Sequence, residues 1–109
     1  MAAQKHLLLV SAGRDKTIRL YNCANGEQLA ILLGHDAWVW SLALHPTGKY
    51  LYSASEDKSL RVWDLNFGKE KKKIEAAHDS FISNVRFSEK YGVLASTGRD
   101  MTIKIWTLK

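Results

Sequence analysis

The chain repeats one twelve-residue segment three times, and this repetition constrains its fold more than any other feature. The three copies align without gaps and read SAGRDKTIRLYN, SASEDKSLRVWD and STGRDMTIKIWT. Their shared aspartate recurs after 42 and then 43 residues, at Asp15, Asp57 and Asp100. A second segment repeats with the same period, as GHDAWV from Gly34 and AHDSFI from Ala77. Two markers in step indicate a tandem array of one structural unit.

Each unit has the pattern of short β-strands, rich in β-branched and aromatic residues and bounded by turn residues. Within the middle unit the sequence predicts strands over Trp38–Leu44, Tyr50–Ser53, Ser59–Trp63 and, more weakly, near Lys72–Glu75. The residues HPTGK and EDK between them are typical of tight turns, and Leu7–Val10 is predicted as a strand of the first unit. The charged run GKEKKK, over Gly68–Lys73, is interpreted as a solvated loop. No segment has a sustained helical period, so an all-β fold is predicted.

A four-stranded unit that carries Gly-His and Trp-Asp at this period resembles the WD-repeat β-propeller family. The middle repeat has both dipeptides, at Gly34-His35 and Trp63-Asp64. The third repeat has Ala-His and Trp-Thr instead, and the first has Tyr-Asn in place of Trp-Asp. The resemblance implies one partial propeller, an incomplete ring of about two and a half to three four-stranded blades. The expected repeat units span residues 1–33, 34–76 and 77–109.

The middle unit also contains Ser53, His35 and Asp57, the residue types of a nucleophilic hydrolase. A catalytic triad occurs at one site in a protein. These residue types instead recur at equivalent positions of the repeat, which favours a structural role. The family resemblance implies a network in which the aspartate accepts from turn N–H groups and from the histidine, while the serine bridges the histidine to an indole. Ser53 is preferred to Ser55 as that serine, because the other copies have glycine at the position of Ser55. The residues implied are His35, Ser53, Asp57 and Trp63, and then His78, Ser96, Asp100 and Trp106.

The remaining motifs favour no enzyme, cofactor or metal site. The four histidines (His6, His35, His45 and His78) lack metal-ligand spacing, and His45 is interpreted as a turn residue. The one cysteine, Cys23, allows no internal disulfide and favours a reducing compartment. No glycine-rich phosphate loop and no apolar run of about 18 residues occurs, so no membrane span is predicted. The net charge of +5 admits a nucleic-acid partner, but the basic residues are dispersed apart from the one lysine run, which disfavours it.

The ring is expected to be incomplete at both ends of the chain. The first unit begins on what corresponds to the second strand of a blade, and the last stops after a third strand, at Trp106–Lys109. Propellers of this family commonly end at that point, so we expect the chain to form the C-terminal part of a longer propeller. Open blade edges promote association. The isolated chain is therefore expected to aggregate or exchange strands rather than to remain a stable monomer.

A closer resemblance is to the lissencephaly-protein family of dynein regulators. It rests on GHDAWV, HPTGK, SEDKSLRVWD, AHDSF and the terminal D-x-T-x-K-x-W. The resemblance implies a non-catalytic, cytoplasmic and cytoskeleton-associated scaffold whose top face binds the dynein motor domain. Top-face positions come from the start of the innermost strand and from the residue before the turn aspartate. In this chain they are Trp38, Trp40, Phe81, Ser83, Arg14, Glu56 and Arg99.

Two points stay open at the level of sequence. Trp38 and Trp40 lie two residues apart, so they either contact a partner or pack between blades, and a bulge near the strand start would turn one outward and the other inward. The chain also fits a generic WD-repeat adaptor, such as a ubiquitin-ligase substrate receptor or a peptide reader. In either case the sequence predicts function on surfaces rather than in the scaffold.

Overall fold

The computed structural model describes residues 8–107, which form ten β-strands and, within that range, no helix that could span a membrane. The strands are β1 (Leu8–Ala12), β2 (Ile18–Asn22), β3 (Gln28–Leu32), β4 (Val39–Leu44), β5 (Tyr50–Ser55), β6 (Leu60–Asp64), β7 (Lys69–Ile74), β8 (Ile82–Ser88), β9 (Val93–Gly98) and β10 (Ile103–Thr107). Leu7 and His6 lie outside the described residues, whereas β1 forms where the first strand is predicted.

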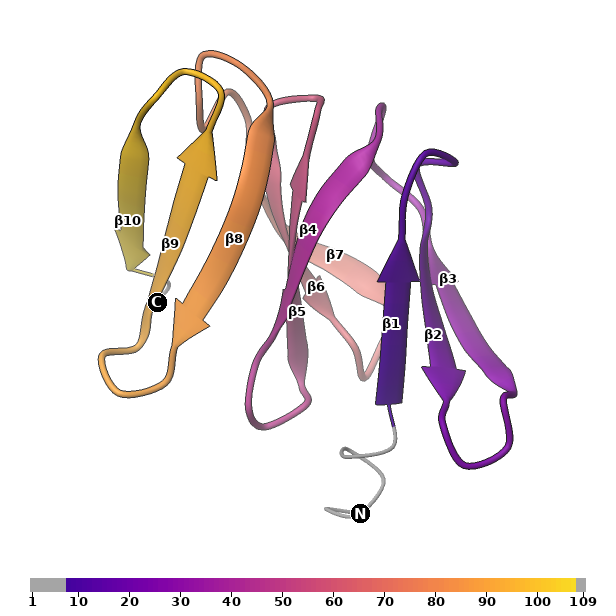
Figure 1. Ribbon diagram of the computed structural model, residues 1–109. Helices are drawn as coiled ribbons and strands as arrows, with labels where there is room; N and C mark the ends of the chain where they lie inside the picture. The colour runs from indigo at the N-terminus through magenta and orange to yellow at the C-terminus, as the bar shows by residue number, and fades with distance from the viewer. Residues whose placement is uncertain (1–7, 108–109) are drawn as a thin grey trace.

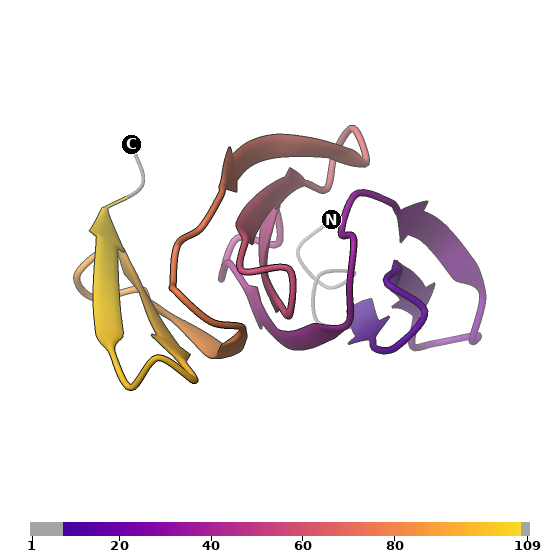
Figure 2. The same cartoon turned by 90° about the horizontal axis from the view of Figure 1, so that it is seen from above.

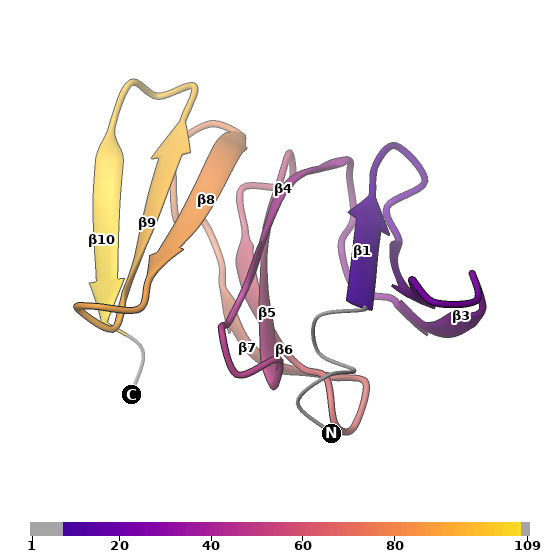
Figure 3. The ribbon, with the colours of Figure 1, turned by 60° about the horizontal axis from the view of Figure 1, so that its bottom comes forward.

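The strands form three antiparallel sheets that stand side by side (Figure 1). The first has the order β1-β2-β3, the second β4-β5-β6-β7, and the third β10-β9-β8. Seen from above, the sheets follow one another along an open arc (Figure 2), and the tilted view separates them again (Figure 3). The prediction of an all-β, open and incomplete propeller is confirmed.

Apolar residues that alternate along the strands fill the two spaces between the sheets. Ile18, Leu20 and Leu32 of the first sheet pack with Leu51 and Trp63 of the second. A matching cluster between the second and third sheets contains Tyr52, Ala54, Leu60, Val62, Ala77, Ile82, Val85 and Leu94. Each face of the second sheet is therefore buried against a neighbour, because side chains alternate between the faces of a strand.

The interpretation of the lysine run as a loop is wrong. Residues Lys69–Ile74 form β7, which pairs with β6 and begins three residues earlier than predicted. The strand is almost entirely exposed, so its lysine side chains stay in contact with water while its backbone completes the sheet. Lysines are typical of such edge strands because they oppose pairing with another chain.

Candidate functional site

Beneath the surface of the second sheet, four side chains form one hydrogen-bonded series. The Trp63 indole N–H donates to Ser53 Oγ at 2.9 Å, and Ser53 Oγ lies 2.6 Å from His35 Nε2. His35 Nδ1 lies 2.9 Å from Asp57 Oδ2. The Asp57 carboxylate can only accept and the indole N–H can only donate. The imidazole therefore donates from Nδ1 to the carboxylate, and the serine hydroxyl accepts from the indole and donates its own proton to Nε2.

The third sheet repeats the same series. Trp106 Nε1 donates to Ser96 Oγ at 2.9 Å, Ser96 lies 2.8 Å from His78 Nε2, and His78 Nδ1 lies 3.0 Å from Asp100 Oδ1. Ser53 and Ser96 are both fully buried, and each hydroxyl already has two partners. Enclosed serines of this kind have no free position for a substrate, which favours the structural reading of the Ser-His-Asp pattern.

The two aspartates also hold the turns that follow them. Asp57 accepts from the backbone N–H of Asp36 and of Ser59, and Asp100 accepts from the equivalent groups. Burial of Asp57 works to raise its pKa, but the hydrogen bonds from His35, Ser59 and the turn outweigh it, so the pKa lies well below its usual range. The Thr102 hydroxyl contributes most to lowering the pKa of Asp100.

Sequence reasoning missed one member of each network. Ser59 donates to the Asp57 carboxylate and Thr102 donates to Asp100 at 2.7 Å, while both also approach the histidine Nδ1. The signal was present, because a hydroxyl residue stands two positions after the aspartate in all three copies. In the first sheet the equivalent Thr17 Oγ1 is buried without a hydrogen-bond partner in the described residues.

Arg61 is a further buried group that the sequence analysis missed. Its guanidinium lies 2.8 Å from Glu70 Oε1 and 3.5 Å from Asp57 Oδ2, and it is 4% exposed. A Cβ at Gly34 would lie 2.7 Å from its Nη1, which explains why the middle unit has glycine before its histidine. Lys104 occupies the place of Arg61 in the third unit and is exposed, and there alanine precedes the histidine.

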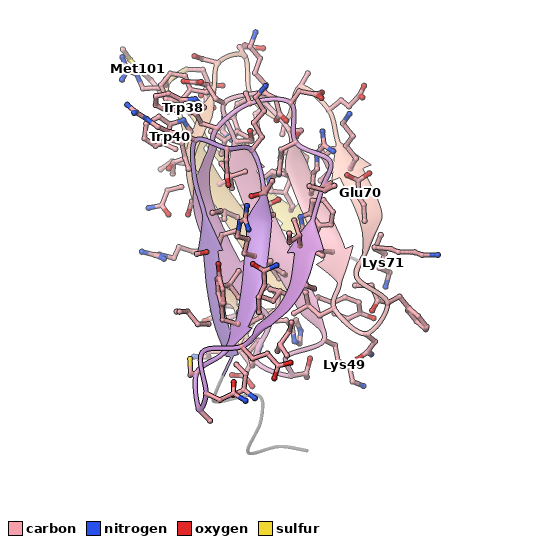
Figure 4. The ribbon with its side chains drawn as sticks, turned by 90° about the vertical axis from the view of Figure 1, so that its right-hand side faces the viewer. Trp38, Trp40, Lys49, Glu70, Lys71 and Met101 are labelled. Atoms are coloured by element: carbon pink, nitrogen blue, oxygen red, sulfur yellow. The ribbon has the colours of Figure 1, made fainter. Side chains whose placement is uncertain are left out.

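Above these networks, five of the predicted top-face residues form one continuous row. Trp38 and Trp40 have ring centroids 5.7 Å apart, and Trp40 stacks on Phe81 of the third sheet at 5.8 Å. Arg14 lies over the Trp38 ring at 4.4 Å, and Arg99 lies over Phe81 at 5.2 Å. We call these five residues the aromatic row. It crosses all three sheets at the end where the β5–β6 and β9–β10 turns lie, at the top in Figures 1 and 4.

The two remaining top-face residues lie at the margin of the aromatic row. Ser83 is exposed, with its hydroxyl 3.3 Å from the Thr97 carbonyl. Glu56 is half-buried, and its backbone N–H donates to the Trp38 carbonyl at 2.8 Å. The N–H of Arg99 makes the equivalent bond to the Phe81 carbonyl at 3.0 Å. The backbone below the row is thus fixed in the same way in two sheets.

A β-bulge decides how the two tryptophans lie. The register between β4 and β5 shifts between Val39 and Ser41, so Trp40 is the extra residue. Neither tryptophan is turned fully inward: Trp38 is half-buried and Trp40 is 46% exposed. Trp40 therefore packs against the next sheet through one face and remains open to solvent on the other, and its contact with a partner stays a prediction.

Comparison with known proteins gives matches over most of the chain. Residues 26–64 and 68–107 match the family described as WD domain, G-beta repeat. The chain is 46% identical over 101 residues to Lissencephaly-1 homolog 1 of Paramecium tetraurelia, which covers 93% of this chain and 25% of that protein. It is 39% identical over 104 residues to Nuclear distribution protein PAC1 of Yarrowia lipolytica, which covers 90% of this chain and 24% of that protein. The chain thus spans about a quarter of the length of these relatives.

Proposed function

Because the chain belongs to the WD-repeat family, we propose that it is a non-catalytic protein-interaction scaffold and that the aromatic row is its contact surface. The relatives named for nuclear distribution and lissencephaly support a role in regulating a microtubule motor. The partner we propose is the dynein motor domain, and the location is the cytoplasm, in association with the cytoskeleton.

The observation that carries the proposal is the composition and continuity of the aromatic row. Trp and Arg are the residue types most enriched where truncation weakens protein binding strongly. Here Trp40 presents nearly half of its surface to solvent, while Phe81 and Trp38 hold it on both sides. A side chain that is already held in place loses little conformational entropy when a partner covers it.

Replacement of Trp40 by alanine tests the proposal. We expect the affinity of the chain for purified dynein motor domain to fall at least about tenfold, since truncation of such a residue costs about 2 kcal/mol or more. Biolayer interferometry measures the affinity, and the melting temperature should change little because Trp40 is the bulged, half-exposed residue of β4. Trp38→Ala should act in the same direction, with some loss of stability because Trp38 is more buried.

Phe67 supplies the matched control. It is 74% exposed, in the turn between β6 and β7 and outside the aromatic row. Phe67→Ala should leave dynein binding unchanged. Equal losses in Trp40→Ala and Phe67→Ala would contradict a role for the row. Full binding by folded Trp40→Ala would instead favour an adaptor that uses another surface.

A further inference from the structure

A cavity of about 260 Å³ lies between the second and third sheets, near the end opposite to the aromatic row. Its walls come from the β4–β5 turn, from strands β5 to β8, and from the turn that follows β8. The lining residues are His45, Tyr50, Tyr52, Val62, Lys71, Lys72, Phe87 and Gly92. Neither the structural networks nor the aromatic row uses these side chains, so the cavity is a separate feature of the molecule.

The interior of the cavity is aromatic, and the Tyr52 hydroxyl adds a polar group to it. Phe87 stacks on Tyr52 with ring centroids 5.3 Å apart and contacts His45 at 4.7 Å. Tyr52 as a whole is only 4% exposed, but its hydroxyl is not a fully buried atom and forms no hydrogen bond with any residue in the range 8–107, so it is open to the cavity. Burial raises the pKa of Tyr52, so its phenol stays protonated and can donate. A hydroxyl that is open to the cavity and has no protein partner can donate to an acceptor on a bound segment.

The mouth of the cavity is positive because of a second bulge. The register between β6 and β7 shifts so that Lys71 is the extra residue, which places it beside Lys72 on the side of the third sheet. Lys71 Nζ lies 3.2 Å from Tyr50 Oη and 4.4 Å above the Tyr50 ring. Within residues 8–107 no carboxylate lines the cavity, since the neighbouring Glu70 is bound to Arg61 on the opposite face of the sheet. Figure 4 shows Lys71 extending away from the body of the molecule, on the same side as Glu70.

The size and charge of the cavity restrict what it can accept. Pockets for drug-sized molecules are about 300–1,000 Å³ in volume, so this one is suited to a single large side chain. The aromatic walls favour a ring, and the two lysines with the Tyr52 hydroxyl favour an adjacent carboxylate. We propose that the cavity binds an aromatic side chain of a protein partner that is flanked by acidic residues. It would be a second contact site, on the opposite end of the fold from the aromatic row.

A short peptide tests this proposal directly. The amidated, acetylated tripeptide Glu-Phe-Glu is titrated into the full chain labelled with ¹⁵N and ¹³C, and the chemical shifts are followed. We expect saturable shifts at Tyr52, Phe87 and Gly92, and none at Trp40. The tripeptides Lys-Phe-Lys and Glu-Ala-Glu should bind at least about tenfold more weakly, because each lacks one of the two recognised groups. Equal binding of all three peptides, or shifts confined to other residues, would overturn the proposal.

Variants of the strand β7 separate specific recognition from general attraction by positive charge. Replacing both Lys71 and Lys72 by glutamine should weaken binding of Glu-Phe-Glu at least about fivefold and reduce its dependence on salt. Lys73→Gln is the matched control, because its Nζ pairs with Glu75 and it does not line the cavity. Equal losses in the double variant and in Lys73→Gln would contradict the site.

Tyr52→Phe removes only the hydroxyl that is free in the structure, so the fold should be retained, and circular dichroism checks this. We expect it to weaken Glu-Phe-Glu binding by about threefold to tenfold. Unchanged affinity in the folded variant would exclude the hydroxyl from the site. Phenylacetate serves as a small-molecule comparison. Binding of phenylacetate as tight as that of the peptide would overturn the choice of a protein segment as the occupant.

Discussion

Ser53 joins the two halves of its network, and its removal tests how much the network stabilises the fold. In Ser53→Ala the His35 imidazole and the Trp63 indole N–H would both lose their shared partner while remaining buried. A buried polar group without a partner costs about 1–3 kcal/mol, so we expect the free energy of unfolding to fall by about 2–4 kcal/mol. Urea denaturation measures it. The control is Ser11→Ala, at the equivalent but exposed position of the first sheet, which should change stability by less than about 0.5 kcal/mol.

Asp57 makes the stability of the fold depend on acid pH. Burial opposes ionisation, but hydrogen bonds from His35, Ser59 and the turn hold the folded pKa of this carboxyl below its unfolded value of about 3.9. The unfolded chain therefore takes up a proton first, and the stabilisation, complete above about pH 5, is lost as the pH falls below about 4. Urea melts from pH 7 down to pH 3 should show a steeper loss for the natural chain than for Asp57→Asn. If the free energy of unfolding fell with pH equally in the natural chain and in Asp57→Asn, Asp57 would not be the origin of the acid sensitivity.

At the residue scale, repetition in the sequence predicts the network partners well, since equivalent positions must serve equivalent contacts. It selects Ser53 over Ser55 because the other two copies have glycine at the position of Ser55. Comparison of copies reveals a contact less well when its residue types change from copy to copy. Arg61 pairs with Glu70, whereas the equivalent Arg19 bonds Gln28 at 3.2 Å and the third unit has Lys104 in the place of the arginine.

At the scale of strands, one buried ion pair attaches β7 to β6. Glu70→Ala would leave the Arg61 guanidinium almost fully buried, with the Nε–H bond to Ser59 Oγ and the longer contact to Asp57 as its remaining interactions. Because Glu70 itself is one-third exposed, we expect a loss of about 1–2 kcal/mol in the free energy of unfolding, less than for a fully buried pair. The exposed pair of Lys73 and Glu75 is the control. Glu75→Ala should cost less than about 0.5 kcal/mol, and equal effects of the two variants in chemical denaturation would contradict the distinction.

The same strand shows why periodicity predicts some elements and misses others. Strands β4, β5 and β6 bury residues on at least one face, so their apolar patterns predict them to within about two residues. In β7 the alternation of apolar and polar residues is missing, because the strand is exposed to water and has a bulge at Lys71. Its structure depends on hydrogen bonds to β6, which no local composition encodes.

At the scale of the whole molecule, contacts between sheets determine two surface features that the sequence repeat alone does not predict. The resemblance places Trp38, Phe81, Arg14 and Arg99 on one face, but the stacking of Trp40 on Phe81 depends on the spacing of the second and third sheets. The cavity at the opposite end has the same origin, because Phe87 reaches it from the third sheet and Tyr52 from the second. Both surfaces therefore require at least two sheets packed together.

The outward face of the third sheet predicts self-association of this chain. Leu60 and Val62 are buried where the second sheet packs on the third, whereas the equivalent Ile103 and Ile105 are 73% and 62% exposed. These two isoleucines lie on β10, the edge strand of their sheet. The same strand therefore carries both unpaired backbone N–H and C=O groups and exposed apolar side chains. We expect the weight-average mass in sedimentation or light scattering to rise with concentration.

A single charge on that strand should reverse the effect. Ile105→Lys places an ammonium group on the exposed face of β10, where docking of a second sheet would have to bury it. Association should weaken at least about tenfold. Met101→Lys is the control, because Met101 is 97% exposed but lies in the β9–β10 turn rather than on the edge strand. A concentration-independent monomer mass for the natural chain, or equal effects of the two lysines, would show that β10 is not the associating edge.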